Sequence, residues 1–227
     1  MIEYMRPYRL KNADPEEIED LLIRVERSFN IKFHHRELAH IKSFGEFCDY
    51  IAEKIELENS EDCTGQQAFY KLRDGISYIQ NINKALILTA SPLHGLFPKT
   101  CRRQQVKRLE SYLGLKLNLL IPPLWETATL VVLFLASLTY FFFDWKIGLT
   151  ALCLSVTGFW ISGKLGRGMR KTTVGELAAK MRRENYIKSR RNPETYNKRE
   201  IEVILREWFS DDLDIDKEEL TRDAKFI

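Results

Sequence analysis

The sequence lacks the residue patterns that mark most enzymes and metal proteins. It has only four cysteines, Cys48, Cys63, Cys101 and Cys153, and their spacing is not that of a metal site. No nucleophile elbow, glycine-rich dinucleotide loop or pair of catalytic carboxylates is apparent. We therefore expect no catalytic residues, no metal ligands and no enzymatic activity. We also expect reduced thiols, as in a cytoplasmic protein.

Two further patterns are missing from the first part of the chain. Residues 1–10 contain no apolar core of the kind that a cleavable signal peptide needs. His34, His35 and His40 have no cysteine or carboxylate set at ligand spacing, so we interpret them as solvated side chains rather than metal ligands.

Two long apolar runs are the most distinctive feature that the sequence does contain. They cover residues 124–143 and 147–165, and Asp144, Trp145 and Lys146 separate them. Each run is close to the ~20 residues that a helix needs to cross a bilayer, and lipid requires the backbone to be helical there. We predict a transmembrane hairpin over 124–165. The alternative is a buried helical hairpin in a soluble core.

Cations flank the predicted hairpin on both sides, whereas the turn inside it carries one cation and one anion. The positive-inside rule therefore predicts that both termini are cytoplasmic and that the protein is integral to the cytoplasmic (inner) membrane. The net charge is only +3, so membrane lipid is a simpler partner for these cations than nucleic acid, which we do not expect to bind. The candidates for contacts with lipid headgroups are Arg102, Arg103, Lys107, Arg108, Lys164, Arg167, Arg170 and Lys171.

Capping residues and apolar periodicity predict helices on either side of the hairpin, and hence an all-α fold. Asp14 precedes Pro15 at the start of one helix, and Ser43 and Thr173 each begin a capping box. Within the first segment we also expect a short helix at 37–41. The predicted segments are helices over 14–56, a linker at 57–65, a helical segment at 66–117 with helices at 66–80 and 102–113, the hairpin, a helix at 172–184, a basic linker at 185–198, and a last helix with its loop at 199–227.

An internal repeat is the most informative pattern in these helices. The residues VERSFNIKF at 25–33 match LESYLGLKL at 109–117, and SFGEF at 43–47 matches TVGEL at 173–177. The same two patterns thus occur twice in the same order. In the second occurrence the predicted hairpin lies between them.

These patterns resemble those of the acyl carrier proteins, a family of small four-helix bundles that carry acyl chains on phosphopantetheine. Residues 14–56 resemble the second, third and fourth helices of that family, and 199–227 resemble its first helix and the following loop. Residues 66–117 with 172–184 resemble a degenerate further copy. The resemblance implies carrier-like helical bundles that accompany the hairpin.

The resemblance departs from the family at the attachment site of the prosthetic group. The family uses a serine in an Asp-Ser-Leu motif, where this chain has Asp14-Pro15-Glu16 and Pro98-Lys99-Thr100. Pro15 and Lys99 occupy the expected attachment positions and have no hydroxyl, and Thr100 lies one residue away as a remote candidate. We therefore expect no cofactor.

The order of the helices also departs from the family, because the pattern of the first helix comes last in the chain. We predict a circularly permuted bundle in which residues 199–227 pack on 14–56. The alternative is that the last helix pairs with a second chain in a domain-swapped homodimer. The two apolar faces are Ile201, Ile204, Leu205 and Trp208 on the last helix and Leu21, Leu22, Val25 and Phe29 on the first.

These observations predict a non-enzymatic integral membrane protein that presents degenerate carrier-like modules at the cytoplasmic face to a protein partner. Alternatives are a working acyl or phosphopantetheine carrier tethered to the membrane for lipid or secondary-metabolite synthesis, and a small membrane enzyme or transporter subunit. The resemblance implies docking through carboxylates, although an ordinary solvated face explains them equally well. The candidate docking residues are Glu16, Glu17, Glu19, Asp211, Asp212, Asp214 and Asp216.

Overall fold

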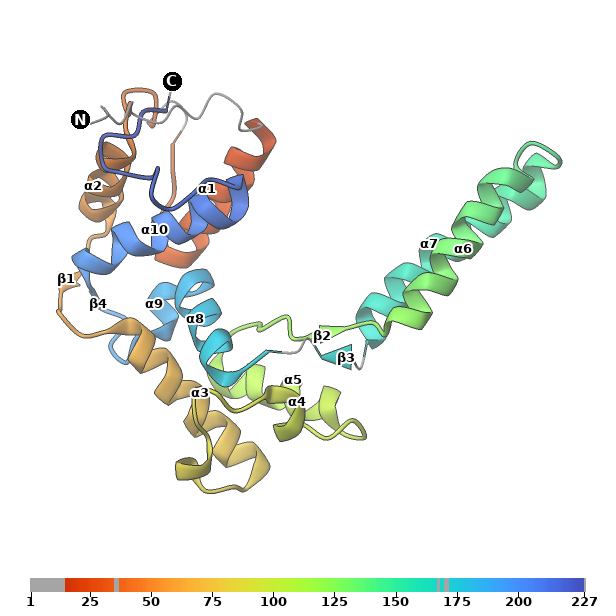
Figure 1. The fold of residues 1–227 in the computed structure, drawn as a ribbon, viewed down its shortest axis with the longest axis horizontal. Coiled ribbons are helices and arrows are strands. Elements are labelled where there is room, and N and C mark those ends of the chain that lie inside the picture. Colours follow the sequence, from red (N-terminus) through yellow and green to blue (C-terminus); the bar gives the residue numbers. More distant parts are fainter. Residues whose placement is uncertain (1–14, 35–36, 167, 170–171, 227) are drawn as a thin grey trace, which may run out of the picture. The chain divides into compact units, whose positions relative to one another are not determined.

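The computed structural model describes residues 15–34, 37–166, 168–169 and 172–226 (Figure 1). These residues are mostly helical, which confirms the predicted all-α class, and the strands among them are pairs of residues. The helices are α1 (Pro15–Phe29), α2 (Phe44–Lys54), α3 (Thr64–Gln80), the 3-10 helix η1 (Lys84–Leu86), α4 (Leu93–Leu96), α5 (Arg102–Leu113), α6 (Leu124–Tyr140), α7 (Trp145–Leu165), α8 (Val174–Glu184), α9 (Tyr186–Ser189) and α10 (Lys198–Leu213). The strands are β1 (Glu58–Asn59), β2 (Leu120–Ile121), β3 (Gly168–Met169) and β4 (Thr195–Tyr196).

The chain divides into two compact units, one made of the residues up to Leu72 and from Leu177 onward, and the other of Arg73–Glu176. In the first unit, the last helix α10 packs against both α1 and α2 (Figure 1). Ile204 and Leu205 of α10 are fully buried, in one core with Val25 of α1 and Ile51 of α2. Residues from the two ends of the described chain therefore build one hydrophobic core.

The loop that follows α10 closes this core against the start of α2. The backbone amides of Phe44 and Gly45 donate to the carbonyls of Ala224 and Arg222, each at 2.8 Å. A side chain at position 45 would not fit, because its Cβ would lie 2.7 Å from the Arg222 carbonyl oxygen. Gly45 thus permits the loop to lie directly on the helix.

The two predicted linkers are more ordered than their composition indicates. Strand β1 from the first linker pairs in parallel with β4 from the second, and α9 lies inside the basic linker. Arg190 of that linker is completely buried, and its guanidinium donates to the hydroxyls of Thr64 (2.5 Å) and Thr195 (3.2 Å). The basic linker therefore holds the two connections together.

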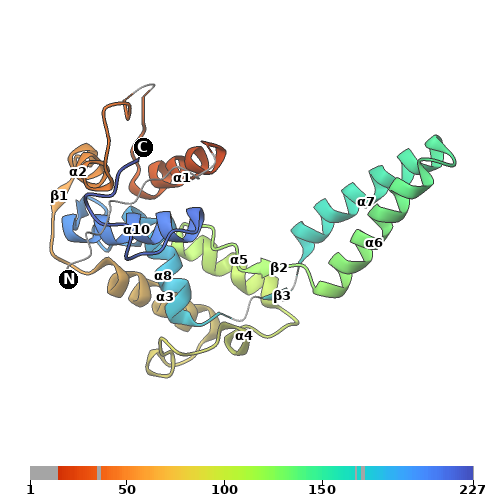
Figure 2. The ribbon, with the colours of Figure 1, turned by 45° about the horizontal axis from the view of Figure 1, so that its top comes forward.

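In the second unit, the part of α3 that belongs to it packs closely on α5. A Cβ at Gly75 would lie 2.8 Å from Leu109 Cδ1 and 3.0 Å from a ring carbon of Tyr112. The same unit contains α6 and α7, which lie side by side in both views (Figures 1 and 2). Their contact includes Gly158, whose missing side chain leaves room for Leu130.

Helix α7 is apolar and long enough to cross a membrane over Trp145–Lys164, by length and composition, and no other helix in the described part of the chain meets both criteria. Helix α6 is equally apolar but has 17 residues. The antiparallel pair of β2 and β3, with Ile121 opposite Gly168, joins the segment before α6 to the segment after α7.

The repeated patterns adopt the same local structure. At the end of α1, the carboxylate of Glu26 accepts a hydrogen bond from the Phe33 amide at 2.5 Å. At the end of α5, the carboxylate of Glu110 accepts one from the Leu117 amide at 2.8 Å. The residue that follows each helix, Asn30 or Gly114, has a positive φ of 55° or 68°. Each helix thus ends in the same left-handed turn, closed by the same glutamate.

The similarity extends to the loops that cover the capping boxes. The amides of Val174 and Gly175 donate to the carbonyls of Ser91 and Thr89, at 2.9 and 2.8 Å, as those of Phe44 and Gly45 do to the loop after α10. Each loop begins at a residue with positive φ, Asn81 in one and Asp214 in the other. We name the set α10, 214–226, α1 and α2 copy A, and the set α3, 81–93, α5 and α8 copy B.

Two details of the first segment differ from the sequence prediction or lie beyond what the structure describes. The short helix predicted at 37–41 is a turn, in which the Ile41 amide donates to the Leu38 carbonyl at 3.1 Å. The Glu37 carboxylate is bound by Lys54, at 2.5 Å, rather than by a helical neighbour. The predicted N-cap residue Asp14 lies outside the described residues.

Replacement of Ile204 by alanine should destabilise the first unit, because this side chain is fully buried between the helices of copy A. We expect a loss of about 2–5 kcal/mol in the free energy of unfolding and faster hydrogen exchange of the amides at 21–55. The matched control is Val203→Ala in the same helix, since Val203 is 44% exposed. Equal exchange at 21–55 in both variants would show that α10 does not stabilise α1 and α2.

Candidate partner-binding surface

The acidic docking candidates lie at two helix ends in the first unit. Glu16, Glu17 and Glu19 are exposed at the start of α1. Asp211 and Asp212 end α10, and each is paired within the chain, Asp211 with Arg183 and Asp212 with Arg24 at 3.0 Å. The exposed Asp214 and Asp216 follow in the loop. Part of the predicted docking charge is therefore neutralised by the protein's own arginines.

A basic segment of the chain occupies the surface between α1 and α10. Arg182, at the end of α8, makes two hydrogen bonds to Glu207, at 2.5 and 2.7 Å. Arg183 also lies over the Trp208 ring, 5.7 Å from its centroid. The Ser28 hydroxyl accepts from the Tyr186 amide at 3.1 Å. Copy A thus shows how one helix end with two arginines docks on this kind of surface.

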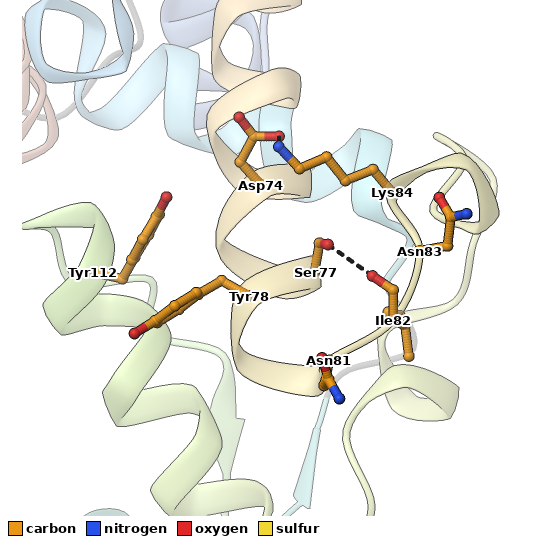
Figure 3. Close-up of a pocket in the computed structure, with 8 residues that line it drawn as sticks. All are labelled: Asp74, Ser77, Tyr78, Asn81, Ile82, Asn83, Lys84 and Tyr112. Carbon is orange, nitrogen blue, oxygen red and sulfur yellow. Dashed lines mark hydrogen bonds and ion pairs between the residues drawn. The ribbon is translucent and has the colours of Figure 1, made fainter.

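The second unit contains an open hollow of about 690 Å³ between α3, the following loop and α5 (Figure 3). Two tyrosine rings stack at one side of it, with centroids 5.5 Å apart, and Tyr78 and Tyr112 are 76% and 52% exposed. At the other side Asp74 pairs with Lys84 at 2.8 Å. The lining residues are Asp74, Ser77, Tyr78, Asn81, Ile82, Asn83, Lys84 and Tyr112.

This hollow has the chemistry of a binding surface rather than of a catalytic centre. The Ser77 hydroxyl donates to the Ile82 carbonyl at 2.7 Å, so its proton is engaged with the backbone (Figure 3). The carboxylate and the exposed tyrosine rings suit a cation that can also stack on an aromatic face. The sequence analysis missed Tyr78 and Tyr112, because lone tyrosines at helical spacing carry no motif.

The positions that match the carrier attachment site do not form a recognisable cofactor site. Pro15 is the first residue of α1, and Lys99 and Thr100 are exposed in the turn before α5. The Thr100 hydroxyl lies 3.8 Å from the Cys101 sulfur, and the two residues line an open hollow of about 340 Å³ with Lys99 and Lys107. Nothing in this arrangement activates the hydroxyl, so the structure adds no support for a prosthetic group there.

The candidates for lipid contacts differ in how accessible they are. Arg102 is buried and donates to the carbonyls of Phe97 and His94, at 3.0 and 3.3 Å, so its guanidinium is bound within the protein rather than presented at the surface. Arg103 is half-buried, and Lys107 and Arg108 are exposed on α5. Lys164 is exposed and its ammonium group lies 3.5 Å from the centroid of the Trp160 ring. The candidates Arg167, Arg170 and Lys171 lie outside the described residues.

In the part of the chain that the structure describes, neither the histidines nor the cysteines gather into a metal site. The described residues contain no group of three side chains that could hold a metal ion. His34 faces Glu37 at 3.4 Å, and Cys63, Cys101 and Cys153 are exposed. Burial raises the pKa of the Cys48 thiol to about 12, so this thiol is inert at neutral pH.

Comparisons with protein-family models, with curated proteins and with solved structures found no match. They give no support to the resemblance to the acyl carrier proteins. The function is therefore argued from the contacts and surfaces of the chain itself.

Co-expression with a phosphopantetheinyl transferase should leave the mass of the protein unchanged, because neither Pro15 nor Lys99 can form the phosphodiester. Intact-mass spectrometry checks this result. A shift by one phosphopantetheine that disappears in Thr100→Ala would contradict it and favour a working carrier.

Proposed function

We propose that this chain is a non-enzymatic integral membrane protein that presents two related helical modules to a protein partner at the cytoplasmic face. The observation that carries the membrane part is the exposed apolar surface of α6, α7 and the turn between them. Leu124, Phe142, Phe143 and Leu154 are 87%, 91%, 88% and 74% exposed. Removing one such side chain from water is worth about 1.5–3 kcal/mol. Lipid would cover all of them at once.

The polar groups of α6 and α7 also suit a hydrocarbon environment. Seven hydroxyls donate to carbonyls three or four residues earlier in the same helix, with donor–acceptor distances of 2.7–3.0 Å. The Ser162 hydroxyl lies 3.2 Å from the Glu126 carboxylate, which is on the other helix. Such internal pairing removes the need for water. The seven hydroxyls are those of Thr127, Thr129, Ser137, Thr139, Thr150, Ser155 and Thr157.

The core of copy A supports two crossings of the membrane rather than one. Helices α1 and α2 precede the apolar segment and α10 follows it, yet they share one core. A single crossing would separate them by the bilayer. If α7 spans the membrane, α6 must return the chain, and 17 residues are at the lower end of the usual range of about 17–25. The cations that flank the pair favour the cytoplasm for both ends.

The soluble modules support binding rather than catalysis. The described residues bring no metal-ligand set together. They do offer paired and exposed carboxylates in copy A and an aromatic hollow in copy B. A membrane-tethered acyl carrier remains the alternative, on the resemblance alone.

The protein should stay in the membrane pellet after extraction with alkaline carbonate. The matched control is a variant in which a flexible Gly/Ser linker replaces 124–165, and this variant should become soluble because the apolar surface is gone. Release of the full chain into the aqueous phase would contradict the proposal.

Tags on the two ends provide the topology test. Protease should remove both tags in inside-out vesicles of the inner membrane. It should remove neither tag in cells whose outer membrane is permeabilised and whose inner membrane is intact. Cleavage of one tag in each preparation would contradict two crossings.

A further inference from the structure

The two copies differ at exposed positions next to the hollow of Figure 3. The residues with positive φ at which the two loops begin align Asp214 with Asn81, and three residues earlier Asp211 aligns with Tyr78. The left-handed turns that follow α1 and α5 align Ser28 with Tyr112. In the loops, the exposed Leu86 and Leu88 of copy B, 71% and 62% accessible, stand where copy A has glutamate and threonine. Copy B therefore exposes apolar and aromatic groups where copy A is polar.

In copy A the corresponding surface is already filled by the end of α8. Arg182 is bound by Glu207, which aligns with Asp74 of copy B, and Arg183 is bound by Asp211, which aligns with Tyr78. The carboxylate that receives the first arginine is thus present in both copies. In copy B the structure pairs it with Lys84, and this pair is more than 40% exposed on both sides, where such a pair contributes little.

We propose that the hollow formed by Asp74, Tyr78 and Tyr112 binds the arginine-bearing end of a helix from a partner protein. The occupant is inferred from the way copy A binds the end of α8. The first arginine would pair with Asp74 in place of Lys84. The second would stack on the tyrosine pair, as Arg183 stacks on Trp208.

The chemistry of the hollow favours such an occupant over a small molecule. Tyrosine and arginine are enriched at the centres of protein interfaces, and here two tyrosines are exposed together on helices that pack closely at Gly75. The hollow is open and polar on one side, which suits a side chain that arrives on another helix. The inference deepens the proposed function by naming the partner's chemistry, and it does not depend on the membrane.

The test uses the full chain in detergent and a fluorescent peptide with the sequence of residues 177–189, which carries the two arginines. We expect saturable binding in fluorescence anisotropy. The double variant Tyr78→Ala/Tyr112→Ala, which removes both rings and adds no carboxylate, should weaken it at least about tenfold, the effect of losing a central contact. Alanine at both arginines of the peptide should do the same.

Ile23→Ser is the matched control, because Ile23 is another exposed apolar residue, on α1. This variant should bind the peptide as the parent does, and unchanged helical circular dichroism of the double variant would show that it is folded. No saturable binding to the parent chain, or equal binding to the double variant, would overturn the proposal. Dimerisation of the chain that the double variant abolishes would overturn the choice of a different protein as occupant. The extraction and topology results would stand in either case.

Discussion

One core made from both sides of the apolar segment constrains everything else in this protein. Helix α10 buries Ile204 and Leu205 against helices that lie far before it in the chain. The chain therefore leaves copy A, passes through α6 and α7, and returns to the same core. In a bilayer this condition permits two crossings and forbids one. The internal hydrogen bonds of the serine and threonine side chains in α6 and α7 fit the same conclusion.

The same contacts build the two copies of the repeat outside α6 and α7. Each copy uses a glutamate to close the end of one helix and a glycine to let a loop lie on the next. In copy A the segment between the glutamate-closed turn and the glycine of the next helix is short. In copy B the corresponding segment contains the apolar helices α6 and α7. A long insertion at such a place is tolerated because its two ends, β2 and β3, lie next to each other.

Much of the helical structure could be predicted from the sequence, because capping residues and apolar spacing depend on residues that are close together in the chain. The capping boxes at Ser43 and Thr173 are formed, with hydroxyl-to-amide distances of 3.2 Å, and α5 has the bounds that its apolar spacing predicted. The sequence predictions failed where contacts between residues far apart in the sequence determine the local structure. The turn at 37–41 is held by Lys54 rather than by helical bonds, and the burial of Arg102 and Arg190 depends on carbonyls and hydroxyls that folding brings close. The tyrosines of the hollow carried no pattern until the two copies were aligned.

The most direct measurement of the central claim is the reactivity of Cys153 in native membranes. Its side chain is exposed in the middle of α7 even though α6 packs on that helix, so lipid around the helix would shield it. Cys63 and Cys101, also exposed, lie outside α6 and α7 and are internal controls. A membrane-impermeant maleimide should modify Cys63 and Cys101 in inside-out vesicles and leave Cys153 unmodified until the protein is denatured. Modification of Cys153 in the native vesicles at the rate of Cys63 would show that α7 lies in water, and the account would be wrong.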